Sequence, residues 1–121
     1  MAATILVVDD DAISQRLVEM FLTKAGYQVE QAFSGSQCLH FLESRQADLI
    51  FLDVEMPGMA GTEVLQEIRQ RNLAPGTPIY FLSGSENMAM EVKLGRYPVD
   101  GFVKRPFLMP EFVKLVRSIL G

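Results

Sequence analysis

Five strand-like segments alternate along the chain with five helix-like segments, and this alternation constrains the fold more than any other feature of the sequence. Strands are predicted at Thr4–Val8, Tyr27–Ala32, Asp48–Leu52, Ile79–Leu82 and Val99–Val103. Helices are predicted at Ile13–Ala25, Ser34–Glu43, Thr62–Arg71, Ser85–Leu94 and from Met109 to Leu120. Five successive βα units indicate the α/β class, with a doubly wound, parallel five-stranded sheet covered by helices on both faces and right-handed crossovers.

Capping and breaking residues mark the ends of several predicted helices. Asp11 or Asp10 is suited to cap the first helix, and Gly26 is suited to end it. Ser85 is the expected cap of the fourth helix, which Gly95 and Pro98 are expected to end early.

Length and composition narrow the class of protein. A chain of 121 residues with 49% hydrophobic residues predicts one globular domain over residues 1–121. Fifteen acidic against eleven basic residues, a net charge of −4, disfavour direct nucleic-acid binding. The single Cys38 excludes an internal disulfide, and no apolar run of about 18 residues or basic leader predicts membrane insertion or secretion. These features favour a cytoplasmic location.

Polar and charged residues follow the predicted strands at the points where the strands end. In parallel sheets of this class, ligands bind beyond the carboxyl ends of the strands, so these residues are expected to converge on one edge. The set comprises Asp9 and Asp10 after the first strand, Asp53 after the third, Ser83 after the fourth, and Lys104 and Arg105 after the fifth.

Such a set of groups suits phosphoryl transfer. Clustered carboxylates repel one another unless a cation lies among them, and their hard oxygen atoms suit Mg²⁺ or Mn²⁺. A carboxylate also serves as a nucleophile that forms an aspartyl-phosphate. The charge on the transferred group is then neutralised by metal, hydroxyl and fixed cation, which Asp53, Ser83 and a basic residue of the fifth strand would provide.

Four short motifs carry a resemblance to a known family. The sequence resembles the receiver domain of two-component response regulators over essentially its whole length, and the spacing between the motifs matches without gaps. The motifs are VVDD at Val7–Asp10, LDVEMPGMAG at Leu52–Gly61, FLS at Phe81–Ser83 and RPF at Arg105–Phe107. The resemblance implies a single flavodoxin-like (βα)5 domain with strand order 2-1-3-4-5.

The resemblance also assigns roles to individual residues. It implies that Asp53 is the phosphoacceptor, supplied by a histidine kinase or a phosphotransfer domain. Asp9 and Asp10 correspond to the Mg²⁺-binding pair, with Asp10 the more direct ligand, and Glu55 corresponds to the residue whose backbone carbonyl faces the metal. The domain is then no enzyme in the usual sense, although it assists its own phosphorylation and dephosphorylation.

A switch and an output surface follow from the same resemblance. Ser83 corresponds to the hydroxyl residue that binds the phosphoryl group and shifts on activation, and Phe102 to the aromatic residue that turns inward with it. The downstream protein is expected on the face formed by the fourth helix, fifth strand and fifth helix. The sequence leaves open a homodimer, and it leaves open whether the chain acts alone or belongs to a larger regulator.

The residues after the fifth strand depart from the family pattern. The family places a lysine before the proline, whereas Arg105 occupies that position here and Lys104 precedes it. Strand alternation puts Lys104 on the same face as Phe102 and Arg105 on the opposite face. Three readings remain: Arg105 replaces the lysine, a bulge lets Lys104 reach in, or phosphorylation is impaired. The last would make the chain a pseudo-receiver, an interaction module independent of phosphorylation. The resemblance also implies a cis bond between Arg105 and Pro106.

Other features have simpler interpretations. Ala60 replaces an aspartate of the family's loop, with little expected effect on the chemistry. Glu55 and Ser85 are expected to flank the path of attacking water, and we hypothesise that the charge of Glu55 slows hydrolysis. His40 is expected on the surface and Cys38 in the core.

The sequence also separates two methionines and disfavours two other activities. Met88 and Met90 lie two residues apart, so only one is expected to face the core. An aspartate-nucleophile phosphohydrolase is disfavoured because this length leaves no room for a cap domain. Flavin binding is disfavoured because the acidic first loop offers no phosphate cradle.

Overall fold

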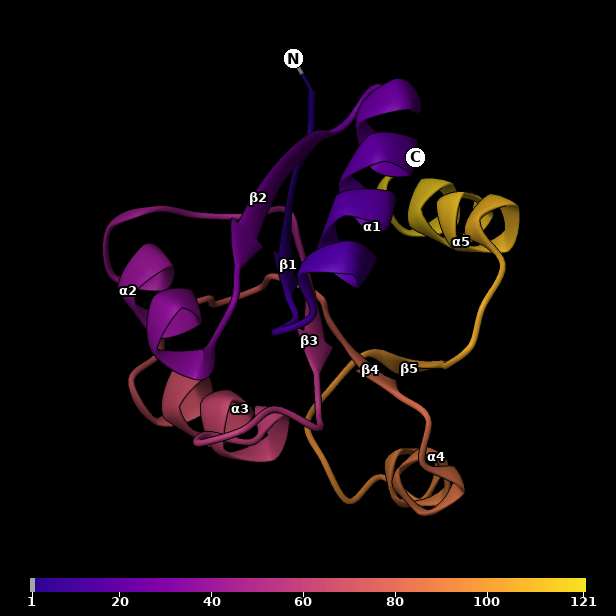
Figure 1. The fold of residues 1–121 in the computed structure, drawn as a ribbon. Coiled ribbons are helices and arrows are strands. Elements are labelled where there is room, and N and C mark those ends of the chain that lie inside the picture. Colours follow the sequence, from indigo (N-terminus) through magenta and orange to yellow (C-terminus); the bar gives the residue numbers. More distant parts are fainter. Residues whose placement is uncertain (1) are drawn as a thin grey trace.

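The computed structural model describes residues 2–121 as one five-stranded sheet with five helices (Figure 1). The strands are β1 (Thr4–Val8), β2 (Gln28–Ala32), β3 (Leu49–Asp53), β4 (Ile79–Ser83) and β5 (Gly101–Lys104). The helices are α1 (Ala12–Lys24), α2 (Gly35–Ser44), α3 (Gly61–Gln70), α4 (Glu86–Lys93) and α5 (Met109–Leu120). The strands pair in parallel in the order β2-β1-β3-β4-β5, which confirms the predicted fold class and strand order.

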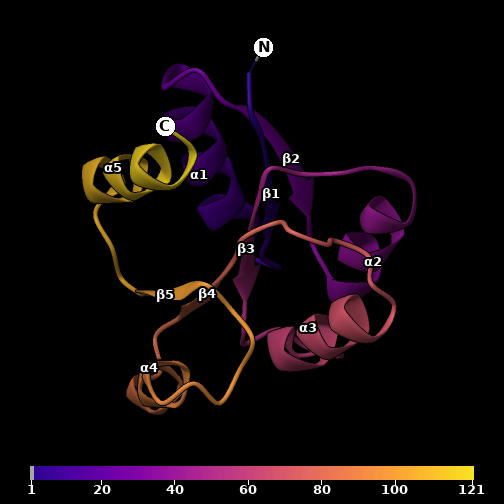
Figure 2. The same ribbon diagram turned by 180° about the vertical axis from the view of Figure 1, so that it is seen from behind.

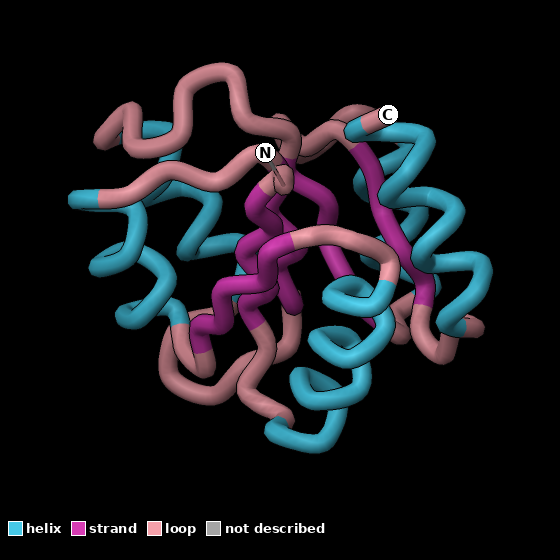
Figure 3. The backbone as a smooth tube through the Cα atoms, turned by 90° about the horizontal axis from the view of Figure 1, so that it is seen from above, coloured by secondary structure: helices cyan, strands magenta, loops and turns pink. Residues whose placement is uncertain are grey.

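The two faces of the sheet bury two separate apolar clusters. Helices α1 and α5 lie side by side over one face, and α2 and α3 lie side by side over the other (Figures 1 and 2). Viewed from above, the strands occupy the middle layer with helices on either side (Figure 3). Alternate residues of each central strand enter opposite clusters, so that Val7 and Phe51 face α1 and α5 while Val8 and Leu52 face α2 and α3. This explains why the central strands are continuous apolar runs.

Most element boundaries differ from the prediction by a single residue, and the largest difference is at β5. The strand begins at Gly101 rather than Val99, because the amide of Val99 donates back to the carbonyl of Tyr97. Helix α4 ends at Lys93, and Gly95 follows with a φ of +75°. This agrees with the early end of the helix that was predicted from Gly95 and Pro98.

Several single-residue predictions are confirmed. Asp11 and Ser85 cap α1 and α4 through their side-chain oxygens. Cys38 is fully buried, and burial raises the pKa of its thiol to about 12. His40 is exposed on α2 beside Glu43.

The two methionines of α4 divide as expected. Met88 packs against the cluster under α2 and α3, whereas Met90 is 54% exposed. Among residues 2–121, no helix combines the length and apolar character needed to cross a membrane.

Gly61 allows α3 to begin directly against the end of β3. A Cβ atom at this position would lie 2.3 Å from the carbonyl oxygen of Asp53 and 2.8 Å from the Cα of Val54. The amide of Gly61 donates to the carbonyl of Val54 at 2.9 Å. Since both obstacles are backbone atoms, neither can move without displacing the end of β3.

We therefore expect Gly61→Ala to lower the free energy of unfolding by about 1–3 kcal/mol, because the added methyl overpacks the contact between α3 and β3. Gly84→Ala is the matched control, since a Cβ at Gly84 meets only the carbonyl oxygen of Arg105 at an ordinary 3.8 Å. Urea denaturation of both variants measures the effect, and equal stability of the two would contradict this account.

Candidate functional site

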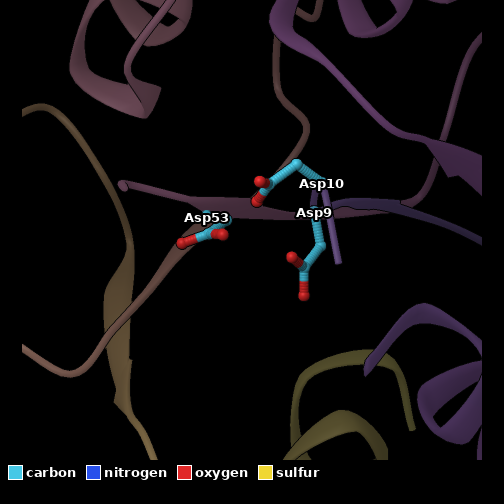
Figure 4. Close-up of side chains that lie close together, drawn as sticks. All are labelled: Asp9, Asp10 and Asp53. Atoms are coloured by element: carbon cyan, nitrogen blue, oxygen red, sulfur yellow. The ribbon is translucent and has the colours of Figure 1, made fainter. Parts of the chain in front are cut away.

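Three carboxylates gather at the carboxyl end of the two central strands. Asp9 and Asp10 follow β1, and Asp53 is the last residue of β3. Val8 pairs with Leu52 in the sheet, so both strands end at the same level. The side chains come together in Figure 4, with one carboxylate oxygen of each residue within 4.8 Å of the others. Asp9 and Asp53 are almost fully buried, at 1% and 3% exposure, whereas Asp10 is exposed.

The turn after β1 orients Asp9 through local hydrogen bonds. The amide of Asp11 donates to Oδ1 of Asp9 at 3.0 Å, and the side chain of Asp11 in turn accepts from the amide of Ile13. One short turn therefore holds a site carboxylate and begins α1. Asp11 is therefore the cap of α1 and does not belong to the cluster of Asp9, Asp10 and Asp53.

Arg105 enters the site, and Lys104 does not. The guanidinium of Arg105 lies 2.5 Å from Oδ2 of Asp9 and 3.3 Å from Oδ1 of Asp53. The ammonium of Lys104 instead pairs with Glu86 of α4 at 2.9 Å. These opposite directions agree with the prediction from strand alternation, and the bond between Arg105 and Pro106 is cis, as the resemblance implied.

Burial dominates the electrostatics of Asp53. Desolvation raises the pKa of its carboxyl to about 7, opposed by the nearby charge of Arg105 and reinforced by that of Asp9. The amide of Glu55 donates to Oδ1 of Asp53 at 3.2 Å and favours the ionised form. An additional cation beside Asp53 would favour its ionised, nucleophilic form further.

Ser83 ends β4 with its hydroxyl close to the side chain of Glu55. The hydroxyl donates to the Glu55 carboxylate, whose two oxygens both lie at 2.7 Å, and it accepts from the amide of Ser85 at 3.0 Å. The resemblance had pointed only to the backbone carbonyl of Glu55 and to a position beside the water path. The contact between its side chain and Ser83 was not predicted.

Phe102 lies on β5 opposite Phe81 of β4 in the sheet register. Its ring is partly buried and packs against the cluster under α2 and α3, on the face of the sheet away from Arg105.

Gln15 belongs to the surroundings of the site, although no sequence motif pointed to it. Its side chain is buried beneath the turn that carries Asp9. The signal was present, because Gln15 lies at helical spacing before the buried Val18 and Leu22 and so falls on the inward stripe of α1.

The cluster suits a divalent cation. Its donors are carboxylate oxygens from Asp9, Asp10 and Asp53, which is the ligand type of Mg²⁺ and Mn²⁺. Three carboxyl groups against the single guanidinium of Arg105 leave an excess of negative charge when all are ionised. The residues present therefore fit such an ion.

Comparison with known proteins gives a consistent result. Residues 5–117 match the model of the response regulator receiver domain. The chain is 34% identical over 116 residues to the transcriptional regulatory protein ResD of Bacillus subtilis, which covers 96% of this chain and 47% of ResD. It is also 34% identical over 118 residues to the autoinducer 1 sensor kinase/phosphatase LuxN of Vibrio harveyi, covering 98% of this chain and 13% of LuxN.

A solved structure agrees over its full length. The chemotaxis protein CheY4 of Vibrio cholerae superposes with a TM-score of 0.86 at 30% identity, covering 98% of this chain and 99% of CheY4. The chain spans about half the length of the first curated relatives that it matches. Together with the fold and the acidic cluster at the carboxyl edge of the sheet, the family match identifies this chain as a member of the response regulator receiver domain family.

Proposed function

We propose that this receiver domain accepts a phosphoryl group on Asp53 from the phosphohistidine of a histidine kinase or a phosphotransfer domain. The observation that carries the proposal is the position of Asp53, buried at the end of a central strand between two further aspartates and one guanidinium. A buried carboxylate with a guanidinium beside it, in a cluster that suits a divalent cation, is suited to nucleophilic attack on phosphorus.

In the proposed step, a carboxylate oxygen of Asp53 attacks phosphorus while the bond from phosphorus to the donor's imidazole nitrogen breaks. The nitrogen keeps the electron pair, and Asp53 becomes an acyl phosphate. Hydrolysis then transfers the phosphoryl group to water and returns the carboxylate. The domain is therefore a phosphoacceptor that assists both reactions and no enzyme with a separate substrate.

A metal ion, when bound, and Arg105 would together neutralise the charge of the transferred group. Asp9, Asp10 and Asp53 would hold Mg²⁺ or Mn²⁺, with the backbone carbonyl of Glu55 as a further ligand, and the ion would supply positive charge beside the phosphoryl oxygens. Arg105 takes the place of the family's lysine, since its guanidinium already contacts Asp53 and its planar fork suits phosphate oxygens.

Ser83 and Phe102 form the proposed switch. In this structure the Ser83 hydroxyl donates to Glu55. After phosphorylation of Asp53 it would turn toward the phosphoryl oxygens, and the partly buried ring of Phe102 would turn inward with it.

The proposed output surface is α4, β5 and α5. No residue of α4 is fully buried, and Met90 and Leu94 are more than half exposed, which suits a helix that moves and contacts a protein target.

The proposed contact surface for the phosphodonor begins at the mouth of the site. Ile13 and Leu17 of α1 line a hollow of about 490 Å³ together with Arg105, Pro106 and Phe107. Ile13 is 81% exposed, whereas Val18 and Leu22 of the same helix are buried. Because this apolar hollow adjoins the guanidinium that touches Asp53, a donor bound there would bring its phosphohistidine to the pocket.

Treatment with acetyl phosphate and Mg²⁺ tests the proposed function directly. We expect intact-mass spectrometry to show the gain of one phosphoryl group in the wild type and no gain in Asp53→Asn, because the amide is not a nucleophile for this transfer. Mg²⁺ binding without any mass gain would overturn the proposal and favour the pseudo-receiver alternative.

Arg105 and the metal ion share two carboxylates, so their charges are expected to compete. We expect Arg105→Gln to tighten Mg²⁺ binding by about tenfold (~1.4 kcal/mol), since a positive charge a few ångströms from the ion is removed, and to slow phosphorylation by acetyl phosphate. Lys104→Gln is the matched control, because it removes the same charge from a side chain that pairs with Glu86. Calorimetric titration measures both affinities, and an equal change in the two variants would contradict the competition.

Glu55 is proposed to slow hydrolysis by adding negative charge beside Ser83 and Asp53. We expect Glu55→Ala to dephosphorylate faster by up to roughly fivefold (about 1 kcal/mol), since the charge is exposed and screened by water. Glu55→Gln keeps an oxygen acceptor for the Ser83 hydroxyl while removing the charge, so it should behave like the alanine variant. An unchanged rate of phosphate release from Glu55→Ala would refute the hypothesis.

A further inference from the structure

Gln15 is a buried polar residue whose side-chain nitrogen reaches three backbone carbonyls. Its Nε2 atom lies 2.8 Å from the oxygen of Val7, 2.9 Å from that of Ala32 and 3.1 Å from that of Asp9. The side chain is only 1% exposed. These contacts join α1 to the carboxyl ends of β1 and β2, directly behind the residues whose carboxylates form the proposed metal site.

The three carbonyls determine how the amide is oriented. If the amide were turned over, its oxygen would face three other oxygens, which is strongly unfavourable. In the orientation observed, Oε1 is buried and has no hydrogen-bond partner among residues 2–121. An unpaired buried acceptor costs free energy, and an apolar side chain of the same shape would avoid that cost but would donate to none of the three carbonyls. The donor function of Gln15 is what offsets this cost.

The hydrogen bonds of Gln15 extend the pairing of β1 and β2 beyond the regular ladder. The ladder ends with Val8 opposite Ala32, and the amide of Asp9 adds one more bond to the carbonyl of Ala32. Gln15 contacts that same carbonyl and the carbonyl of Asp9. The side chain of Gln31 in turn donates to the backbone oxygen of Gln15 at 3.2 Å. Asp9 is thereby fixed on both sides of its peptide backbone.

The side chain of Asp9 is held from the opposite direction. Its carboxylate accepts from the amide of Asp11 and from Arg105, so its orientation depends on where the backbone of Asp9 lies. The next residue, Asp10, continues from the carbonyl that Gln15 contacts. A shift of this peptide would move both carboxylates relative to Asp53.

We propose that Gln15 is a positioning residue for the cation site, which fixes the peptide that carries Asp9 and Asp10 so that both carboxylates face Asp53. The inference rests on the proposed function, because it assumes that these carboxylates bind Mg²⁺. Groups that orient metal ligands without touching the metal commonly contribute tenfold or more to metal affinity.

The test compares Mg²⁺ affinity in Gln15→Met and Leu22→Ala by calorimetric titration of the full chain. Methionine has nearly the same length as glutamine but donates no hydrogen bond, and we expect binding about tenfold weaker than in the wild type. Leu22 is buried on the same helix, in an apolar cluster that includes none of the three aspartates. Leu22→Ala should therefore lose stability without losing Mg²⁺ affinity.

The outcomes separate this inference from the proposed function. If the wild type binds no Mg²⁺, the proposed function fails. If the wild type binds and Gln15→Met binds equally well, or if Leu22→Ala weakens binding as much, the positioning role fails and the proposed function stands.

A measurement on the wild type applies even if Gln15→Met does not fold. Coupling between two sites is reciprocal, so saturation with Mg²⁺ should slow hydrogen exchange of the Gln15 side-chain amide protons observed by NMR. The exposed amide of Gln37, on α2, provides the internal comparison. An exchange rate of Gln15 that Mg²⁺ leaves unchanged would overturn the proposal.

Discussion

Parallel pairing of five strands is the constraint on which the rest of the molecule depends. It places every carboxyl end on one edge, and the register aligns Val8 with Leu52 and Asp53 with Leu82. Because both faces of the sheet are covered by helices, the central strands β1, β3 and β4 are apolar along most of their length, and their polar side chains begin where these strands end. The site therefore lies at the first positions along these strands that the core does not require to be apolar.

That arrangement brings the negative charges of three aspartates together, and Arg105 neutralises part of this charge. Arg105 lies between Asp9 and Asp53, where its planar guanidinium contacts both carboxylates at once. A lysine ammonium is a compact point charge on a flexible stem and is less suited to spanning two carboxylates. The departure from the family's lysine thus changes the shape and the hydrogen-bonding pattern of the cation in the pocket rather than its charge, while Lys104 pairs with Glu86 outside it.

The fold and the convergence of the three aspartates were predictable because both follow from local pattern and topology. Apolar runs, helical periodicity and caps such as Asp11 depend on residues close in sequence, and topology alone places the strand ends together. The contact of Glu55 with Ser83 was not predictable, because it joins loops after β3 and β4 through side-chain rotamers. Gln15 was missed for a different reason. Its spacing placed it on the buried face of α1, but only the positions of the Val7, Asp9 and Ala32 carbonyls explain a polar residue there.

The sequence by itself determined the class of fold, the strand order through family resemblance, and the set of groups at the carboxyl edge, because these depend on which residue types follow which segments. The tertiary structure decided which groups touch. In the folded chain, Arg105 rather than Lys104 pairs with the aspartates. The Ser83 hydroxyl donates to Glu55, and the Gln15 amide donates to the backbone carbonyl of Asp9. Hydrogen bonds and ion pairs between residues far apart in the chain need donor and acceptor atoms about 3 Å apart, and only the packed structure defines such distances.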